Sequence, residues 1–120
     1  MALYPCVACG FLTFEEPIGS YAICPVCDWE DDHVQARYPG SPVGANHESL
    51  FDYQQRVALK RAPLGVDLVR SYRRVTGWRP LREEEARLVE DEPQTGREYF
   101  DAASMDDPPY YWSASDASAS

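Results

Sequence analysis

Two pairs of cysteines near the start of the chain are the residues best suited to chemistry. The 120-residue sequence contains four cysteines, and all of them lie in Cys6-Val7-Ala8-Cys9 and Cys24-Pro25-Val26-Cys27. Two residues between paired cysteines allow one tight turn to direct both sulfurs at an ion about 2.3 Å away. Two such pairs at this separation predict a tetrahedral, structural site for one Zn²⁺ ion, with Cys6, Cys9, Cys24 and Cys27 as its ligands.

The same cysteines permit several other uses. Disulfides would suit a secreted protein, but no positively charged and apolar signal segment precedes Cys6. A redox-active pair usually begins a helix in a βαβ unit, a pattern that neither pair shows. Iron stays an alternative to zinc, because tetrahedral sulfur suits both metals. His33 or His47 could replace one cysteine, although four cysteines already complete a closed site.

Short strands and tight turns are needed to position these sulfurs. Residues 11–14 and 20–23 are rich in β-formers, and residues 15–19 between them have turn chemistry. We expect the two strands to pair as a hairpin whose open ends carry both cysteine pairs. Gly10 and Asp28 follow the pairs, where the backbone of a zinc knuckle often takes a positive φ that both residue types tolerate.

Helices are expected in the middle of the chain. A first helix would be capped by Asn46 or Ser49 and would end before Pro63. A second helix would end at Gly77 and would place four apolar residues on one face: Leu64, Leu68, Tyr72 and Val75. A third, short helix would cover residues 80–89.

Charge divides the chain into three parts. The net charge is −9, but residues 1–82 carry equal numbers of acids and bases, so the whole excess lies in residues 83–120. Within the neutral part, residues 56–82 carry eight Lys or Arg and a single acid, Asp67. From about residue 91 the sequence lacks periodicity and ends in a Ser/Ala-rich run, which is typical of disorder. We therefore expect a folded domain over residues 1–85 and an acidic flexible tail over residues 91–120.

One patch of aromatic residues interrupts this tail, and it consists of Tyr99, Phe100, Tyr110, Tyr111 and Trp112. The simplest interpretation is a loosely packed terminus. An alternative is that the segment docks on a partner or on the protein's own basic helix, where the counter-charges would be Arg70, Arg73 and Arg74. Exposed pairs of this kind contribute little individually.

An acidic block, Glu30-Asp31-Asp32-His33, follows Trp29 and the second cysteine pair. Carboxylates beside an imidazole could act in catalysis, which requires a cleft and perturbed pKa values. A zinc ion held by four sulfurs leaves no open position at which to activate water. We therefore favour a structural interpretation, in which Trp29 packs over the metal hairpin and the carboxylates cap the next helix or pair with arginines.

Several sequence blocks follow one another in an order that a known family shares. They are Tyr4-Pro5-Cys6-Val7-Ala8-Cys9-Gly10, Ile23-Cys24-Pro25-Val26-Cys27-Asp28-Trp29-Glu30-Asp31-Asp32, Val34-Gln35, Gly44-Ala45-Asn46 and Ser49-Leu50. Over roughly residues 4 to 60 the chain thus resembles the bacterial CPCC cysteine-rich family. That family opens on Cys-Pro-Cys-Cys, so Ala8 stands where relatives carry a further thiol, which a closed four-sulfur site does not need. The resemblance implies a small zinc-ribbon-like bacterial protein and supplies no established activity.

Together with this resemblance, the expected elements predict a small α+β zinc-ribbon-like domain. A metal-clamped β-hairpin would be followed by two or three helices and a disordered acidic C-terminal tail. No apolar run approaches the ~20 residues of a membrane span, so we expect no membrane segment. The cytoplasm is the expected compartment, since thiols stay reduced there.

Three classes of function are compatible with these features. The favoured one is a non-enzymatic protein-interaction module, such as an immunity or antitoxin protein that binds a basic partner. An alternative is a nucleic-acid-binding zinc ribbon that uses the basic residues 56–82, for which the acidic tail would compete. A third is a hydrolase that uses the Glu30–His33 block.

Overall fold

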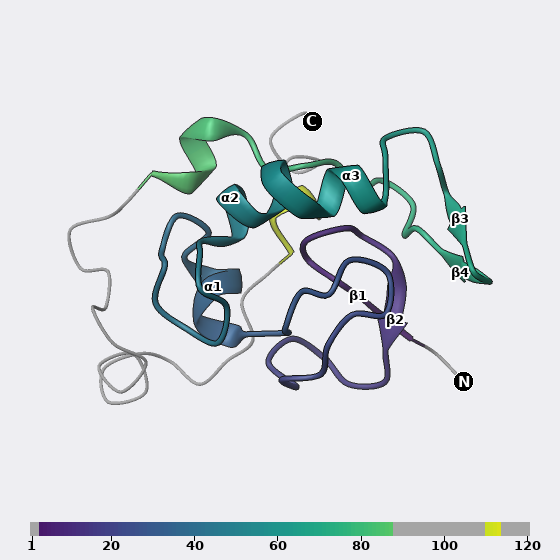
Figure 1. Ribbon diagram of the computed structural model, residues 1–120, viewed down its shortest axis with the longest axis horizontal. Helices are drawn as coiled ribbons and strands as arrows, with labels where there is room; N and C mark the ends of the chain where they lie inside the picture. Colours follow the sequence, from purple (N-terminus) through teal and green to yellow (C-terminus); the bar gives the residue numbers. More distant parts are fainter. Residues whose placement is uncertain (1–2, 88–109, 114–120) are drawn as a thin grey trace.

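A continuous helix crosses the molecule, with one small antiparallel hairpin below it and a second beside its end (Figure 1). The computed structural model describes residues 3–87 and 110–113. In chain order the elements are β1 (Tyr4–Pro5), β2 (Leu12–Phe14), α1 (His33–Arg37), α2 (Leu50–Tyr53), the π-helical η1 (Gln54–Ala58), α3 (Leu59–Arg61), β3 (Leu68–Val69), β4 (Tyr72–Arg73) and the 3₁₀-helix η2 (Glu83–Ala86). The coarse prediction of a small α+β fold is confirmed.

The strands near the cysteines pair differently from the prediction. β2 pairs antiparallel with β1, which precedes the first cysteine pair. Residues 20–23 pair instead with residues 29–31, where Tyr21 N–H donates to Asp31 O and Asp31 N–H donates to Ala22 O, each at 2.9 Å. The predicted hairpin between residues 11–14 and 20–23 is therefore wrong. The tight turn within each cysteine pair reverses the chain, so each pair brings its own flanking residues together.

The second predicted helix is also wrong, because its residues form the β3–β4 hairpin. Arg70 and Ser71 make the two-residue turn, with φ of 46° and 74°, respectively. Positive φ at both positions is the requirement of a type I′ hairpin turn and stops a helix. β-branched and aromatic residues around this turn favour strands. Leu64 and Leu68, expected on a buried helix face, are 61% and 55% exposed.

The first predicted helix is confirmed as the continuous run of α2, η1 and α3. Ser49 is its cap, since Ser49 Oγ accepts the Asp52 N–H at 3.1 Å. Four positions separated by four residues are buried along it: Leu50, Gln54, Ala58 and Ala62. In a helix of 3.6 residues per turn such a spacing drifts around the axis, and the wider π-helical turn of η1 offsets that drift. No helix in residues 3–87 or 110–113 has the length and apolarity needed to cross a membrane.

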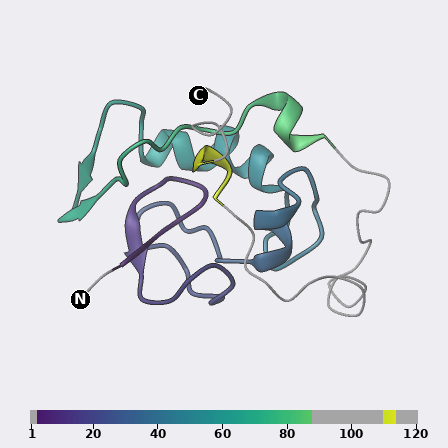
Figure 2. The same cartoon turned by 180° about the vertical axis from the view of Figure 1, so that it is seen from behind.

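The third predicted helix is reduced to the single 3₁₀ turn of η2, and residues 88 and 89 lie outside the described part. The amide of Arg82 donates to Glu85 Oε1 at 2.8 Å and so starts this turn. Residues 110–113 form another turn, drawn in yellow beside the long helix in Figure 2. Trp112 is buried there and stacks on Tyr110 with ring centroids 4.8 Å apart. This part of the predicted tail therefore packs on the domain, and the remainder lies outside the described residues.

The core of the described residues surrounds the cysteines. All four cysteines are fully buried, and the largest side chain that encloses them is Trp29, which is also fully buried. Trp29 contacts Tyr53 of α2 with ring centroids 5.2 Å apart. Trp29 thus packs in the core formed around the cysteine turns, as the structural interpretation of its block predicts.

Candidate metal centre

The two cysteine pairs lie in turns with the same backbone pattern, which we call the first knuckle (residues 6–11) and the second knuckle (residues 24–29). In each knuckle the amide four residues after the first cysteine donates to its carbonyl oxygen: Gly10 to Cys6 at 2.7 Å and Asp28 to Cys24 at 2.9 Å. Those two residues have φ of 80° and 69°, as the sequence predicts. The amide of each first cysteine also donates five residues ahead, to Phe11 O or Trp29 O. The turn geometry is therefore set locally by glycine and aspartate.

The knuckles face each other and bring the four sulfurs into one cluster. All four Sγ atoms lie within 4.8 Å of one another, and the Cys6–Cys27 and Cys9–Cys24 distances are both 3.7 Å. A disulfide would require about 2.05 Å, and all four thiols are free. Four sulfurs at about 2.3 Å from a central ion would be separated by about 3.8 Å. The cluster is thus compatible with binding a metal ion tetrahedrally and closed to further ligands.

The environment of the sulfurs favours a bound cation over free thiolates. Cys24 Sγ accepts hydrogen bonds from the Val26 amide at 3.4 Å and the Thr13 hydroxyl at 3.5 Å. Hydrogen bonds from the neighbouring cysteines lower the pKa of Cys24, whereas burial raises the pKa of Cys6. Without a cation, burial keeps some of the four thiols protonated. A bound metal ion would allow all four sulfurs to be thiolates.

The acidic block is divided between two structural tasks. Asp31 Oδ2 accepts hydrogen bonds from the amides of Gly19 and Ser20 and from the Ser20 hydroxyl, at 2.8 to 3.1 Å. Asp32 caps α1 by accepting the Gln35 amide at 3.0 Å. Both carboxylates are buried, and burial raises the pKa of Asp31. The prediction that acids of this block cap the next helix is confirmed for Asp32.

A polar network explains the Gly-Ala-Asn segment that follows α1. The side chain of Asn46 pairs with the backbone of Glu30, accepting its N–H at 3.0 Å and donating to its carbonyl oxygen at 2.9 Å. The fully buried Gln35 side chain accepts from Asn46 Nδ2 at 2.9 Å and donates to Glu48 O at 2.9 Å. Gly44 has φ of 143°, and a Cβ there would lie 2.8 Å from Asp32 Oδ2. Asn46 therefore acts as a bridge to Glu30, the residue that follows the second knuckle, and is not the helix cap.

Gln54 joins three distant segments, and sequence reasoning missed it. Its Nε2 donates to Ala8 O of the first knuckle and to the Tyr111 hydroxyl, both at 3.0 Å. Its Oε1 accepts the Leu81 amide at 2.7 Å. The signal that could have found it is a polar residue four positions after Leu50, on the apolar face of the predicted helix.

The basic residues 56–82 are largely engaged within the protein. Arg56 pairs with Glu48, Arg61 with Asp28 and Arg79 with Glu85. Arg70 donates to Pro25 O, and the side chain of Arg74 is only 5% exposed. The aromatic segment that docks at residues 110–113 meets Arg79, which lies over the Tyr111 ring at 5.5 Å. The sequence analysis expected Arg70, Arg73 and Arg74 as the counter-charges of this segment. For residues 110–113 that expectation is wrong, because the cation in contact is Arg79.

The predicted site residues other than cysteines do not join the sulfur cluster. Among the described residues the candidate metal ligands are the four cysteines, and neither His33 nor His47 belongs to that group. His33 begins α1, where it packs on Gly19, and His47 is exposed. The histidine alternative therefore has no support in this geometry.

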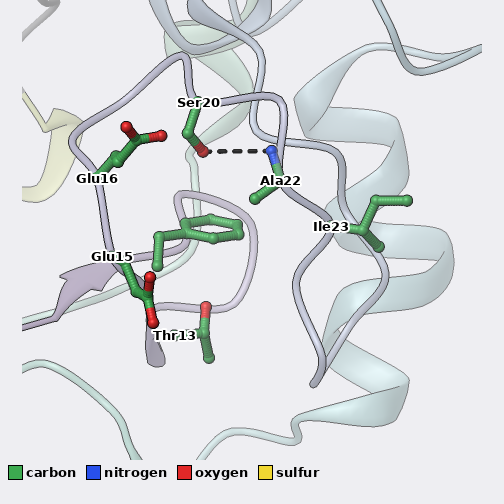
Figure 3. Close-up of a pocket in the computed structure, with 7 residues that line it drawn as sticks. Thr13, Glu15, Glu16, Ser20, Ala22 and Ile23 are labelled. Carbon is green, nitrogen blue, oxygen red and sulfur yellow. Dashed lines mark hydrogen bonds between the residues drawn. The ribbon is translucent and has the colours of Figure 1, made fainter.

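An acidic groove lies beside the second knuckle (Figure 3). It has a volume of about 490 Å³ and is lined by Thr13, Phe14, Glu15, Glu16, Ser20, Ala22 and Ile23. Figure 3 shows Glu15 and Glu16 on one side and Ala22 and Ile23 on the other, with Ser20 Oγ accepting the Ala22 N–H at 3.2 Å. Both glutamates are exposed, and neither has a salt bridge within the described part of the chain. The groove exists because residues 11–14 and 20–23 do not pair.

Comparison with known proteins agrees with the cysteine geometry. Among curated proteins, none matches this chain. The model of a protein family described as Cysteine-rich CPCC matches residues 4–61, a range that begins at β1, contains both knuckles and ends with α3. Over these residues, slightly less than half of its length, the chain is similar to the cysteine-rich CPCC family.

Proposed function

We propose that Cys6, Cys9, Cys24 and Cys27 bind one structural Zn²⁺ ion and that the domain so held binds a protein partner without catalysing a reaction. The zinc part is supported by four buried sulfurs at the spacing of a tetrahedral site and by the Val26 amide, which donates to Cys24 Sγ. A closed four-sulfur site has no position for a substrate or a reactive water. The metal would therefore contribute folding free energy rather than chemistry.

The zinc site is tested by metal analysis of the full chain purified without chelator. We expect about one zinc per chain, lost together with folding in Cys24→Ser. His47→Ala is the control, since this exposed residue lies outside the sulfur cluster. Less than about half an ion per chain would contradict the site, and stoichiometric iron would contradict the choice of metal.

The partner that best fits the groove is a basic, extended segment of another protein. Glu15 and Glu16 have no salt bridge within the described residues and lie beside apolar surface from Ile23, which is 61% exposed. An arginine or lysine side chain can bury its aliphatic stem on such a surface and place its charge at the carboxylates. An immunity or antitoxin role, with a basic toxin as partner, stays a prediction.

The two alternative functions have less support from the described residues. Nucleic-acid binding needs free cations along one face, and most of the cations in residues 56–82 are paired or bonded to carbonyl oxygens. A hydrolase would need carboxylates free to exchange protons with a substrate, and Asp31 and Asp32 already accept backbone amides.

The groove is tested with synthetic peptides in which lysine or arginine alternates with apolar residues. We expect the unmodified chain to bind these peptides at low salt. The affinity should fall by at least about fivefold in the double variant Glu15→Gln/Glu16→Gln, which removes two exposed negative charges. Glu83→Gln/Glu84→Gln is the matched control, because it removes the same charge at exposed positions of η2. Equal weakening in both variants, or no binding, would contradict the groove as the site. Tighter binding to single-stranded DNA than to any peptide would favour the nucleic-acid alternative.

A further inference from the structure

Arg74 is enclosed beside the first knuckle in a cage of carbonyl oxygens and aromatic rings. Its Nε donates to the carbonyl oxygen of Cys9 at 2.9 Å. Its guanidinium contacts the rings of Phe11 and Trp78, with both ring centroids 4.7 Å from Cζ. Its remaining donors reach, at 2.7 to 3.1 Å, the carbonyl oxygens of Ala62, Pro63 and Val66. This cage fixes the position of a charge in the interior.

A buried cation is costly unless a negative group lies close to it. Among the described residues, the one salt-bridge partner of Arg74 is Asp67, at 4.0 Å, and Asp67 is 79% exposed. A contact this long to a solvated carboxylate offsets little of the cost. An arginine stays protonated in proteins, so loss of the proton does not relieve this cost. The carbonyl oxygens and the two aromatic rings offset part of this cost, and a full negative charge close by would offset more of it.

The sulfur cluster is the nearby group that could supply it. Four thiolates and one divalent ion carry a net charge of about −2. We propose that Arg74 is the counter-charge of this metal–sulfur cluster, positioned against the backbone of the ligand Cys9 by its carbonyl and aromatic cage. This inference rests on the proposed metal site and adds a residue that lies outside residues 4–61.

The role of Arg74 follows from general properties of metal sites. Groups in contact with the ligands commonly change metal affinity by about 10- to 100-fold when they are replaced. Arg74 holds the turn after α3 through Pro63 and Val66, and it reaches the first knuckle through Cys9. Replacing it thus affects packing as well as charge, and the two effects need separate measurements.

The first test is zinc affinity of the full chain, measured by competition with a chelator. We expect Arg74→Met to weaken zinc binding by at least about tenfold. Arg73→Met is the matched control: it removes the same charge one residue away at an exposed position, and we expect its affinity to stay within about twofold of the unmodified chain. Equal affinities for the two variants would overturn the role of Arg74. Failure of the unmodified chain to take up metal would overturn the proposed site itself.

The second test separates charge from packing by loading the same proteins with iron alone. Reduction adds negative charge to the cluster, so loss of a nearby cation should shift the reduction potential to more negative values in Arg74→Met and leave it unchanged in Arg73→Met. Arg74→Lys keeps the charge but loses most carbonyl contacts, so its stability should fall while its potential stays near that of the unmodified chain. An unchanged potential in Arg74→Met would overturn the proposal. If Arg74→Met does not fold, a reduction potential that is more negative in Arg74→Lys than in the unmodified chain would overturn the proposal instead.

Discussion

Replacing Gln54 with leucine should weaken the packing between the first knuckle, the segment at Leu81 and the turn at residues 110–113. Leucine has a similar size but no polar atoms, so the substitution removes hydrogen bonds and leaves little empty space. Gln54 is fully buried and bonds to Ala8 O, the Leu81 amide and the Tyr111 hydroxyl. The change therefore leaves up to three buried polar groups without this partner.

The size of the effect follows from counting those groups. The Tyr111 hydroxyl keeps its contact with Val7 O at 3.2 Å, so its loss is partial. The Leu81 amide and Ala8 O each lose the contact with Gln54, and an unsatisfied buried group costs about 1–3 kcal/mol. We expect Gln54→Leu to lower the free energy of unfolding by about 2–6 kcal/mol, a large share of the total for a domain of this size.

Denaturant unfolding followed by tryptophan fluorescence measures this loss, with zinc held at one fixed concentration because bound metal shifts apparent stability. Gln55→Leu is the matched control: it makes the same chemical change on the next residue, which is exposed. Free energies of unfolding that agree to within about 0.5 kcal/mol between the two variants would refute the reasoning, since exposed substitutions usually lie within that range.

Three further predictions concern the backbone and one tyrosine. Ser71→Gly should raise stability by about 1 kcal/mol, because glycine takes the φ of 74° at this turn position without strain; a lower thermal midpoint would contradict the type I′ assignment. Gly10→Ala should cost more than about 2 kcal/mol, since its Cβ would lie 2.5 Å from Trp78 Cγ; Gly65→Ala, with a similar φ of 88° and open space, should cost less in the same unfolding assay. Burial raises the pKa of Tyr53 to about 12, so the folded state retains a proton that the unfolded state loses from about pH 10. Stability should therefore fall between about pH 10 and 12, and Tyr53→Phe should flatten this part of the urea-midpoint profile; an identical slope in both proteins would count against it.

Features that depend on neighbours within a few residues were predicted well. The spacing of the cysteines, positive φ at Gly10 and Asp28, and the Ser49 cap all depend on contacts between residues at most five apart. The ordered sequence blocks within residues 4 to 60 were likewise sufficient to recognise the resemblance to the CPCC family, whose model matches residues 4–61. Local geometry of this kind is dictated by side-chain chemistry and steric limits on the backbone.

Features that depend on partners far away in the sequence were predicted poorly. Residues 20–23 had the composition of a strand, but their pairing with residues 29–31 follows from the turn of the second knuckle. Residues 64–75 had apolar spacing that fits a helix, and the contacts of this segment with the first knuckle selected a hairpin. The spacing of apolar residues indicates which face of a segment can be buried, but it does not indicate which other part of the chain covers that face.

The sequence was thus enough to identify the four cysteines as one group and to describe the turns that carry them, since both follow from short-range geometry. Tertiary structure decided which charges surround that group. It buried Arg74 beside Cys9, joined Gln54 to three segments, brought Trp112 back onto the core and left Glu15 and Glu16 at an open groove. These outcomes depend on burial and hydrogen bonding between residues far apart in the chain, and the energies of those contacts exist only once the chain has folded.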